Sequence, residues 1–214
     1  MKKLTPAVRQ DVQPLPIVVP RADLDLIESW IPVGARVLDL GCGDGSFLAR
    51  LMKTRQATGY GVEIDDTNVQ RSVANGINVI QQDLEKGLAM FDDHAFDVVI
   101  LSQTLQAMHN TERILREIAR VGKEGVVSFP NFGHWYHVWS IAMGRMPVSK
   151  QMPYQWYNTP NIHLCTVNDF EALLAQIGYT VLGKELFLNG NTVSVLGNLR
   201  STLAVYRFKP QFAQ

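Results

Sequence analysis

A glycine-rich run at residues 37–48 is the part of this chain best suited to holding a ligand. Its sequence is Val-Leu-Asp-Leu-Gly-Cys-Gly-Asp-Gly-Ser-Phe-Leu, which reads as a buried strand that stops at glycines, with a helix directly behind it. Glycine allows positive φ and lets the backbone approach a ligand, because no Cβ intervenes. The following helix offers unpaired N–H groups to polar or anionic atoms. The run therefore predicts a loop that binds a nucleotide-type cofactor.

The spacing of the glycines argues against two common nucleotide loops. A phosphate-binding P-loop requires a lysine after its last glycine, and none follows Gly45. The dinucleotide fingerprint requires a third glycine three residues after the second, where this chain has Ser46. Glycines at 41, 43 and 45, preceded by Asp39, instead favour a smaller cofactor that lies across the strand ends.

Two further acidic residues follow predicted strands. Glu63 ends the second strand about 20 residues beyond the loop, where a carboxylate can bind both ribose hydroxyls. Asp83 follows the third strand, where it could accept a hydrogen bond from an exocyclic amine. Alone, Asp39 could simply cap its loop and Asp83 could start a turn. Together, three acids without a basic clamp argue against a pyrophosphate and favour a ligand with an amine, a ribose and an adenine, as in S-adenosylmethionine.

The elements that must position these residues alternate between strands and helices, which predicts an α/β fold with a doubly wound, mostly parallel sheet. We expect strands at about 35–40, 58–64, 78–81, 96–101, 125–129, 179–188 and 201–208, and helices at about 23–31, 45–54, 66–75, 111–121 and 166–177. Asp23 is expected to cap the first helix. Residues 1–20 hold four prolines and predict an extended arm, and residues 21–210 predict a single domain.

Composition limits the classes of partner. Lys+Arg and Asp+Glu number 20 each, so no overall basic field indicates nucleic acid. No run approaches 18 apolar residues, and the N-terminal sequence does not resemble a signal peptide, so we expect a cytoplasmic protein without a membrane partner. Two cysteines cannot build a disulfide framework. The oligomeric state stays open.

Three segments resemble the class I S-adenosylmethionine-dependent methyltransferases: Leu38-Asp-Leu-Gly-Cys-Gly-Asp-Gly45, Gly61-Val-Glu-Ile-Asp65 and Gln82-Asp83-Leu84. The resemblance implies a Rossmann-like fold that binds S-adenosylmethionine or S-adenosylhomocysteine. It implies that Asp39, Gly41 and Gly43 hold the methionine end, Glu63 the ribose, Asp83 with Leu84 the adenine, and that Ser102 and Gln103 line the outer face of the cofactor. Leu40, Gly45 and Ile64 complete the expected cofactor-binding set.

More specific segments lie downstream, at residues 102–106, 128–135, 144–147 and 156–166. They are similar to those of the MetW family of bacterial methionine-biosynthesis proteins. That resemblance implies a partner, homoserine O-acyltransferase (MetX), with which the protein would act in forming O-acylhomoserine. An S-adenosylmethionine-dependent methyltransferase with a small-molecule acceptor is the alternative, and the sequence does not establish whether methyl transfer occurs.

A catalytic group is harder to identify, because methyl transfer needs little from a protein beyond alignment. After the fourth strand the chain has Ser-Gln-Thr-Leu instead of the Asn/Asp-Pro-Pro-Tyr/Phe of related amide and amine methylases. The candidates are Asn131, His134 and His163, either histidine being able to act as a general base. His134 and His137 have a spacing that metal sites use, but without a zinc signature we expect structural histidines and no metal.

An aromatic-rich insertion follows the fifth strand, at residues 131–165. Large amphipathic rings serve both lids over substrates and surfaces that dock partners, so the sequence leaves both roles open. A membrane-surface role is less favoured, because Lys and Arg do not accumulate there.

Overall fold

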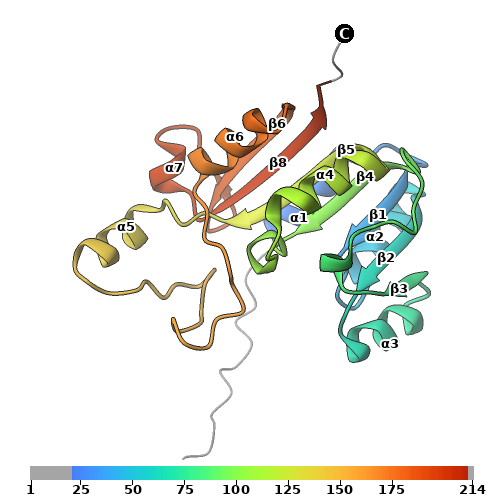
Figure 1. Ribbon diagram of the computed structural model, residues 1–214, viewed down its shortest axis with the longest axis horizontal. Helices are drawn as coiled ribbons and strands as arrows, with labels where there is room; N and C mark the ends of the chain where they lie inside the picture. Colours follow the sequence, from blue (N-terminus) through green and yellow to red (C-terminus); the bar gives the residue numbers. More distant parts are fainter. Residues whose placement is uncertain (1–20, 212–214) are drawn as a thin grey trace, which may run out of the picture.

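One eight-stranded sheet organises residues 21–211, the part of the chain that the computed structural model describes (Figure 1). The strands are β1 (Arg36–Leu40), β2 (Thr58–Glu63), β3 (Val79–Gln81), β4 (Phe96–Ser102), β5 (Gly122–Pro130), β6 (Tyr179–Leu188), β7 (Asn191–Thr192) and β8 (Leu203–Pro210). Their order is β3-β2-β1-β4-β5-β8-β6-β7. The first five are parallel, and β8 runs antiparallel to both β5 and β6.

Helices connect the strands and cover both faces of the sheet (Figure 1). The α-helices are α1 (Ala22–Trp30), α2 (Ser46–Arg55), α3 (Asp66–Ala74), α4 (Thr111–Val121), α5 (Trp135–Ala142), α6 (Val167–Gln176) and α7 (Gly197–Arg200), and the 3-10 helices are η1 (Leu84–Lys86) and η2 (Leu105–Ala107). The predicted α/β class and mostly parallel sheet are confirmed. The predicted extended arm, residues 1–20, lies outside the described residues.

Two hydrophobic cores lie on opposite faces of the sheet. On β1, Leu38 and Leu40 join the core beneath α4 and α6, whereas Val37 joins the core beneath α1 and α2. From Val98 to Leu101, strand β4 divides its side chains in the same alternating way. Because both faces are covered, the central strands are apolar at nearly every position, as parallel sheets require. Among the described helices, none combines the length and the apolar character needed to span a bilayer.

Parallel pairing brings the ends of the first four strands to one edge. Leu40 at the end of β1 pairs with Val62 of β2 and with Leu101 of β4. Glu63, the last residue of β2, pairs with Gln81 of β3. In open α/β sheets, ligands bind outside the carboxyl ends of the strands, where the strand order reverses. Here the order reverses between β1 and β4, so this edge is the place to look for a site.

Candidate functional site

The glycine loop that follows β1 has a backbone that only glycine accommodates easily. Gly41, Gly43 and Gly45 have φ angles of 70°, 58° and 72°. A Cβ at Gly41 would also lie 2.8 Å from the Thr104 hydroxyl, whereas one at Gly43 would meet nothing within 4 Å. The loop is held to β2 because Gly41 N–H donates to the Val62 carbonyl at 2.8 Å. The open side at Gly43 is therefore where a ligand could approach the backbone.

Glu63 is fixed against this loop and is buried. Its Oε2 accepts a hydrogen bond from Gly43 N–H at 2.8 Å, and its Oε1 accepts from the N–H groups of Ile64 at 2.8 Å and Asp65 at 2.9 Å. A carboxylate has about four lone-pair positions, so these three bonds leave acceptor capacity for a further donor. The Glu63 carboxylate is thus held in a fixed orientation at the end of β2, with room for one further hydrogen bond.

Asp39 is almost fully buried, and its carboxylate accepts no hydrogen bond from any residue within 21–211. Burial raises its pKa to about 7; the Arg21 guanidinium opposes this shift and the Glu63 carboxylate adds to it. A buried carboxyl without a partner is costly in its charged form. A cationic ligand group would compensate that cost, so Asp39 has the character of a ligand-binding residue.

The raised pKa of Asp39 makes stability depend on pH. Because the unfolded-state pKa is near 3.8, the folded state holds more protons between pH 3.8 and about 7, and stability falls as pH rises through this window. We expect Asp39→Asn to remove this loss. The melting temperature of the variant minus that of wild type should be about 5 °C larger at pH 8 than at pH 5, which corresponds to about 2 kcal/mol of stability that wild type loses over this range.

Thermal unfolding of the ligand-free protein, monitored by circular dichroism at both pH values, measures this difference. Asp92→Asn, which changes an exposed carboxyl, is the control and should follow wild type at both pH values. A melting-temperature difference between Asp39→Asn and wild type that is independent of pH would contradict the assignment.

Asp83 lies on the same edge and has a structural role of its own. It precedes η1, and its Oδ1 accepts a hydrogen bond from Glu85 N–H at 2.9 Å. The segment is tied to β2 because Gln82 N–H donates to the Glu63 carbonyl at 2.9 Å. The cap uses Oδ1 alone, and Oδ2 accepts no hydrogen bond from the described part of the chain. Asp83 and the neighbouring Leu84 are half-buried, so they remain accessible at the strand end.

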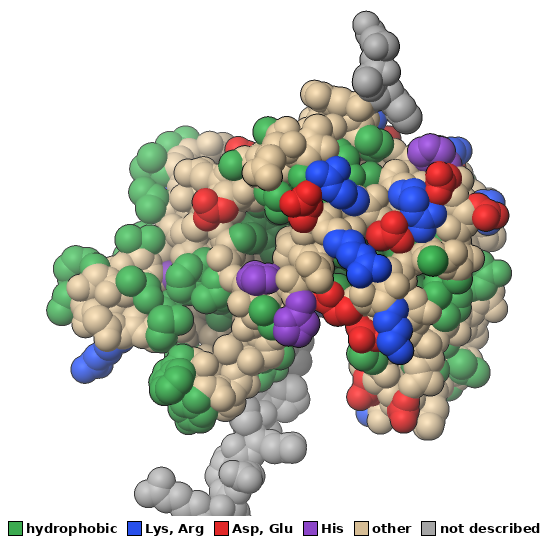
Figure 2. Space-filling model, viewed as in Figure 1, with side chains coloured by type: hydrophobic (Ala, Val, Ile, Leu, Met, Phe, Trp, Pro, Cys, Tyr) green, Lys and Arg blue, Asp and Glu red, His purple; other side chains and the backbone are tan. Residues whose placement is uncertain are grey.

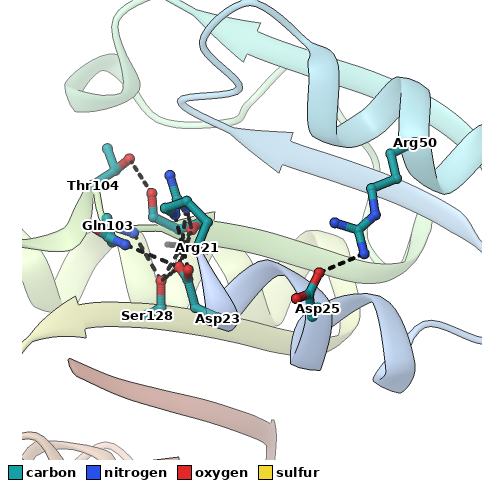
Figure 3. Close-up of polar contacts among 8 residues, drawn as sticks. Arg21, Asp23, Asp25, Arg50, Gln103, Thr104 and Ser128 are labelled. Carbon is teal, nitrogen blue, oxygen red and sulfur yellow. Dashed lines mark hydrogen bonds and ion pairs between the residues drawn. The ribbon is translucent and has the colours of Figure 1, made fainter. Parts of the chain in front are cut away.

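An ion pair that the sequence interpretation missed lies where β4 ends (Figure 3). Asp23 was expected to cap the first helix, and this is wrong: the N-cap residue of α1 is Arg21, and Asp23 lies inside the helix, fully buried against β4 and β5. Arg21 Nε and Nη2 donate to the two Asp23 carboxylate oxygens at 3.0 and 3.1 Å. Although burial acts to raise it, the hydrogen bonds and charge of Arg21 hold the pKa of Asp23 below its ordinary value.

Ser102 and Gln103, predicted to line the outer face of a cofactor, both bond to Asp23. Gln103 Nε2 donates to Asp23 Oδ2 at 3.2 Å, and the Ser102 hydroxyl donates to the same oxygen at 3.3 Å. The Ser128 hydroxyl of β5 completes this set at 3.1 Å. Gln103 has a φ of 51°, a conformation that costs energy for a residue with a Cβ and is concentrated at functional sites. Both side chains therefore fix α1 to the strand ends, and the Arg21 guanidinium itself donates to the Ser102 hydroxyl.

The three catalytic candidates occupy separate environments. His134 caps α5, where its Nδ1 accepts from Tyr136 N–H at 3.3 Å and burial lowers its pKa. His163 is exposed, and its Nε2 lies 3.1 Å from the His109 carbonyl oxygen. It lines a cavity of about 410 Å³ between η2, α4 and α6 that includes none of the acidic residues at the strand ends. Within residues 21–211 no hydrogen bond or ring contact joins any two candidates, and no group of three His, Cys, Asp or Glu has the geometry of a metal site.

Asn131 is buried and joins its own loop to two other segments of the chain by hydrogen bonds. Its Nδ2 donates to the carbonyls of Asn198 at 2.7 Å and Ser201 at 2.9 Å. Its Oδ1 accepts from Gly133 N–H at 2.9 Å and Val167 N–H at 3.3 Å. All of its hydrogen-bonding capacity is directed to the protein, so the structure gives Asn131 a positioning role at the start of the insertion.

We expect Asn131→Ala to lower the free energy of unfolding by about 3 kcal/mol, because it leaves several buried polar groups without partners. Equilibrium urea unfolding measures the loss. Asn168→Ala changes an exposed asparagine at the nearby start of α6 and should alter stability by less than about 0.5 kcal/mol. Equal stabilities of the two variants would show that the hydrogen bonds of the Asn131 side chain do not contribute to the free energy of unfolding.

The insertion at residues 131–165 exposes many large hydrophobic side chains. Its α5 projects away from the sheet, and hydrophobic side chains cover much of this lobe (Figures 1 and 2). The exposed set is Trp135, Tyr136, Val138, Trp139, Ile141, Met143, Met146, Tyr154, Trp156, Tyr157, Ile162 and Leu164. The return of the insertion is anchored near β4, because Ile162 and His163 N–H donate to the Gln106 carbonyl at 2.7 and 3.0 Å. We name this set the insertion surface.

Comparison with solved structures identifies proteins of the same architecture. Solved structures of S-adenosylmethionine-dependent methyltransferases share the fold. One from Mesorhizobium loti has a TM-score of 0.67 with 18% identity, covering 88% of this chain and 98% of that one. Another, from Thermotoga maritima and described as a possible histamine N-methyltransferase, has a TM-score of 0.64 with 17% identity, covering 89% and 88%. At these identities the likeness concerns the fold alone.

Sequence comparison is more specific. The bifunctional methionine biosynthesis protein MetXA/MetW of Rhodopirellula baltica is 38% identical over 175 residues, which cover 77% of this chain; the match spans only 28% of that longer protein. A demethylmenaquinone methyltransferase of Lactiplantibacillus plantarum is 27% identical over 185 residues, covering 76% of this chain and 78% of that one. The profile of the family described as "Methionine biosynthesis protein MetW" matches residues 21–208. This chain therefore belongs to the MetW family of methionine-biosynthesis proteins.

Proposed function

We propose that this protein binds S-adenosylmethionine, or its demethylated product S-adenosylhomocysteine, at the carboxyl edge of the sheet. The observation that carries the proposal is the arrangement of acidic groups around the glycine loop. Glu63 is fixed on Gly43 with acceptor capacity left, Asp39 is buried without a partner, and Asp83 has one oxygen unused. Glu63 fits a ribose hydroxyl, Asp39 fits the ammonium and Asp83 fits the adenine amine.

The partner we propose is a homoserine O-acyltransferase, with which the protein would act in forming O-acylhomoserine. The support comes from the R. baltica relative, whose description names MetXA and MetW in one polypeptide. Two units joined in one chain have a high effective concentration for each other, so weak contacts between them suffice. In separate chains the same association needs a surface that binds strongly by itself.

We propose that the insertion surface is this docking site. Its exposed rings are large and amphipathic, the type that dominates protein interfaces. Residues 131–165 contain Arg145 and Lys150 but no Asp or Glu, so they carry positive charge only. The complementary face of the acyltransferase is therefore expected to be apolar with an acidic rim.

A small-molecule methyltransferase is the second candidate. The 27% identity with a demethylmenaquinone methyltransferase over most of both chains favours it, because that relative is named for a methyl-transfer reaction. In this case the insertion would enclose the acceptor as a lid. Turnover of one acceptor would then be lost in His163→Ala while the affinity for S-adenosylhomocysteine is retained.

Calorimetric titration and an activity assay test the proposal together. S-adenosylhomocysteine is titrated into the protein, and the protein is titrated into a homoserine O-acyltransferase assay. We expect a binding isotherm in the first and a rise in acyltransferase rate that saturates near one equivalent in the second. Absence of binding heat would contradict the cofactor site, and an unchanged acyltransferase rate would contradict the partnership.

A further inference from the structure

A cation and a carboxyl group, those of Arg21 and Asp39, lie at the edge of the sheet where β1 and β4 end. The Arg21 guanidinium donates to the Ser102 hydroxyl at 2.6 Å. Ser102 is the last residue of β4, and the residue before it, Leu101, pairs with Leu40 at the end of β1. The guanidinium is near enough to Asp39 for its charge to stabilise that carboxylate. Within residues 21–211 no ion pair joins the two side chains, so each keeps hydrogen-bonding capacity for a ligand at this edge.

The Arg21 guanidinium is held firmly but incompletely used. Its Nε and Nη2 bind Asp23 in a bidentate manner, which fixes the plane of the group. A guanidinium carries five N–H donors, and the two on Nη1 have no partner among the described residues. The Arg21 side chain is 42% exposed, whereas that of Asp23 is fully buried. Arg21 is therefore a preorganised cation with a free donor edge.

A neighbouring cation and carboxylate are complementary to a zwitterion. The α-amino-acid end of S-adenosylmethionine carries an ammonium and a carboxylate on one carbon. Asp39 offers a buried, unpaired acceptor to the first, and Arg21 Nη1 offers two donors to the second. A phosphate would fit Arg21 alone, but the neighbouring carboxylates of Asp39 and Glu63 would repel it.

We propose that Arg21 binds the α-carboxylate of the cofactor and, with Asp39, selects nucleosides that carry a zwitterionic amino-acid end. This inference rests on the proposed cofactor site and adds Arg21 to it. Arg21 would distinguish S-adenosylhomocysteine from 5′-methylthioadenosine, which has the same adenosine and sulfur but no amino acid. Asp23 acts through Arg21 as a positioning residue.

Calorimetric titration of both nucleosides into wild type and Arg21→Gln tests the inference. We expect Arg21→Gln to weaken binding of S-adenosylhomocysteine by about 10- to 100-fold, since hydrogen bonds to charged groups contribute this much. The affinity for 5′-methylthioadenosine should change by less than about threefold, because that ligand does not reach Arg21. Equal losses for both nucleosides, or no loss for either, would overturn the inference.

Arg50→Gln is the matched control. Arg50 also pairs with carboxylates of α1, Asp25 and Glu28, but lies away from the strand ends (Figure 3). The Arg50→Gln substitution should leave the affinities for both nucleosides unchanged. Because Arg21→Gln leaves Asp23 buried without its ion pair, Arg21→Gln/Asp23→Asn, which removes both charges, is measured as well and should show the same selective loss. Wild-type protein that binds neither nucleoside would overturn the proposed cofactor site itself, which separates the two failures.

Discussion

Replacing Glu63 with alanine is expected to lower the affinity for S-adenosylhomocysteine by about 10- to 100-fold. The variant loses the hydrogen bond that the remaining acceptor position of the carboxylate would accept from a ribose hydroxyl, which contributes about 1.5–3 kcal/mol. It also releases Gly43 N–H, which Glu63 Oε2 accepts at 2.8 Å, so the loop loses one of its anchors. Calorimetric titration at a fixed pH measures the affinity.

Two further variants separate ribose binding from loop anchoring. Glu63→Gln keeps the size of the side chain and an acceptor for Gly43, so it should lose less affinity than Glu63→Ala. Asp66→Asn changes an exposed carboxylate three residues further along the chain and should bind as wild type does. Wild-type affinity in Glu63→Ala would show that the ribose is not placed at the end of β2.

The edge of the sheet could be predicted from sequence because its residues end consecutive strands. Asp39, Glu63 and Asp83 each stand at or just after an apolar run, and a strand–helix alternation implies parallel pairing. Parallel pairing alone then brings the carboxyl ends together, and the observed register of β1, β2 and β3 does so. The local sequence pattern and the topology agree here, so the position of this edge follows from the order of the strands and does not depend on any particular long-range side-chain contact.

The Arg21–Asp23 ion pair could not be predicted in this way. An aspartate before an apolar helix is a common capping signal, and the sequence gives no sign that Asp23 instead contacts residues 79 to 105 positions away. The same holds for Asn131, whose partners Asn198 and Ser201 lie 67 and 70 positions further on. Both side chains are polar and buried, and the partners of such groups are set by tertiary packing. The one local feature that agrees with the ion pair is that Arg21 and Asp23 have opposite charges and stand two residues apart.

The second large effect is expected at the insertion surface. Trp139→Ala combined with Trp156→Ala should weaken association with the acyltransferase by at least about 100-fold, because truncated interface tryptophans commonly cost 2 kcal/mol or more each. Their side chains are 61% and 71% exposed, so their loss creates no cavity in the core and should leave the melting temperature nearly unchanged. Surface plasmon resonance with immobilised acyltransferase measures the dissociation constant.

This variant also distinguishes docking from a lid. Val73→Ala removes part of a hydrophobic side chain that is 62% exposed on α3, outside the insertion, and should bind the acyltransferase as wild type does. If the insertion is a docking surface, the double tryptophan variant loses the acyltransferase and keeps its affinity for S-adenosylhomocysteine, because the acidic strand ends are untouched. If it is a lid, the variant keeps the acyltransferase and instead loses turnover of a methyl acceptor. Unchanged association would therefore contradict the docking proposal without affecting the cofactor site.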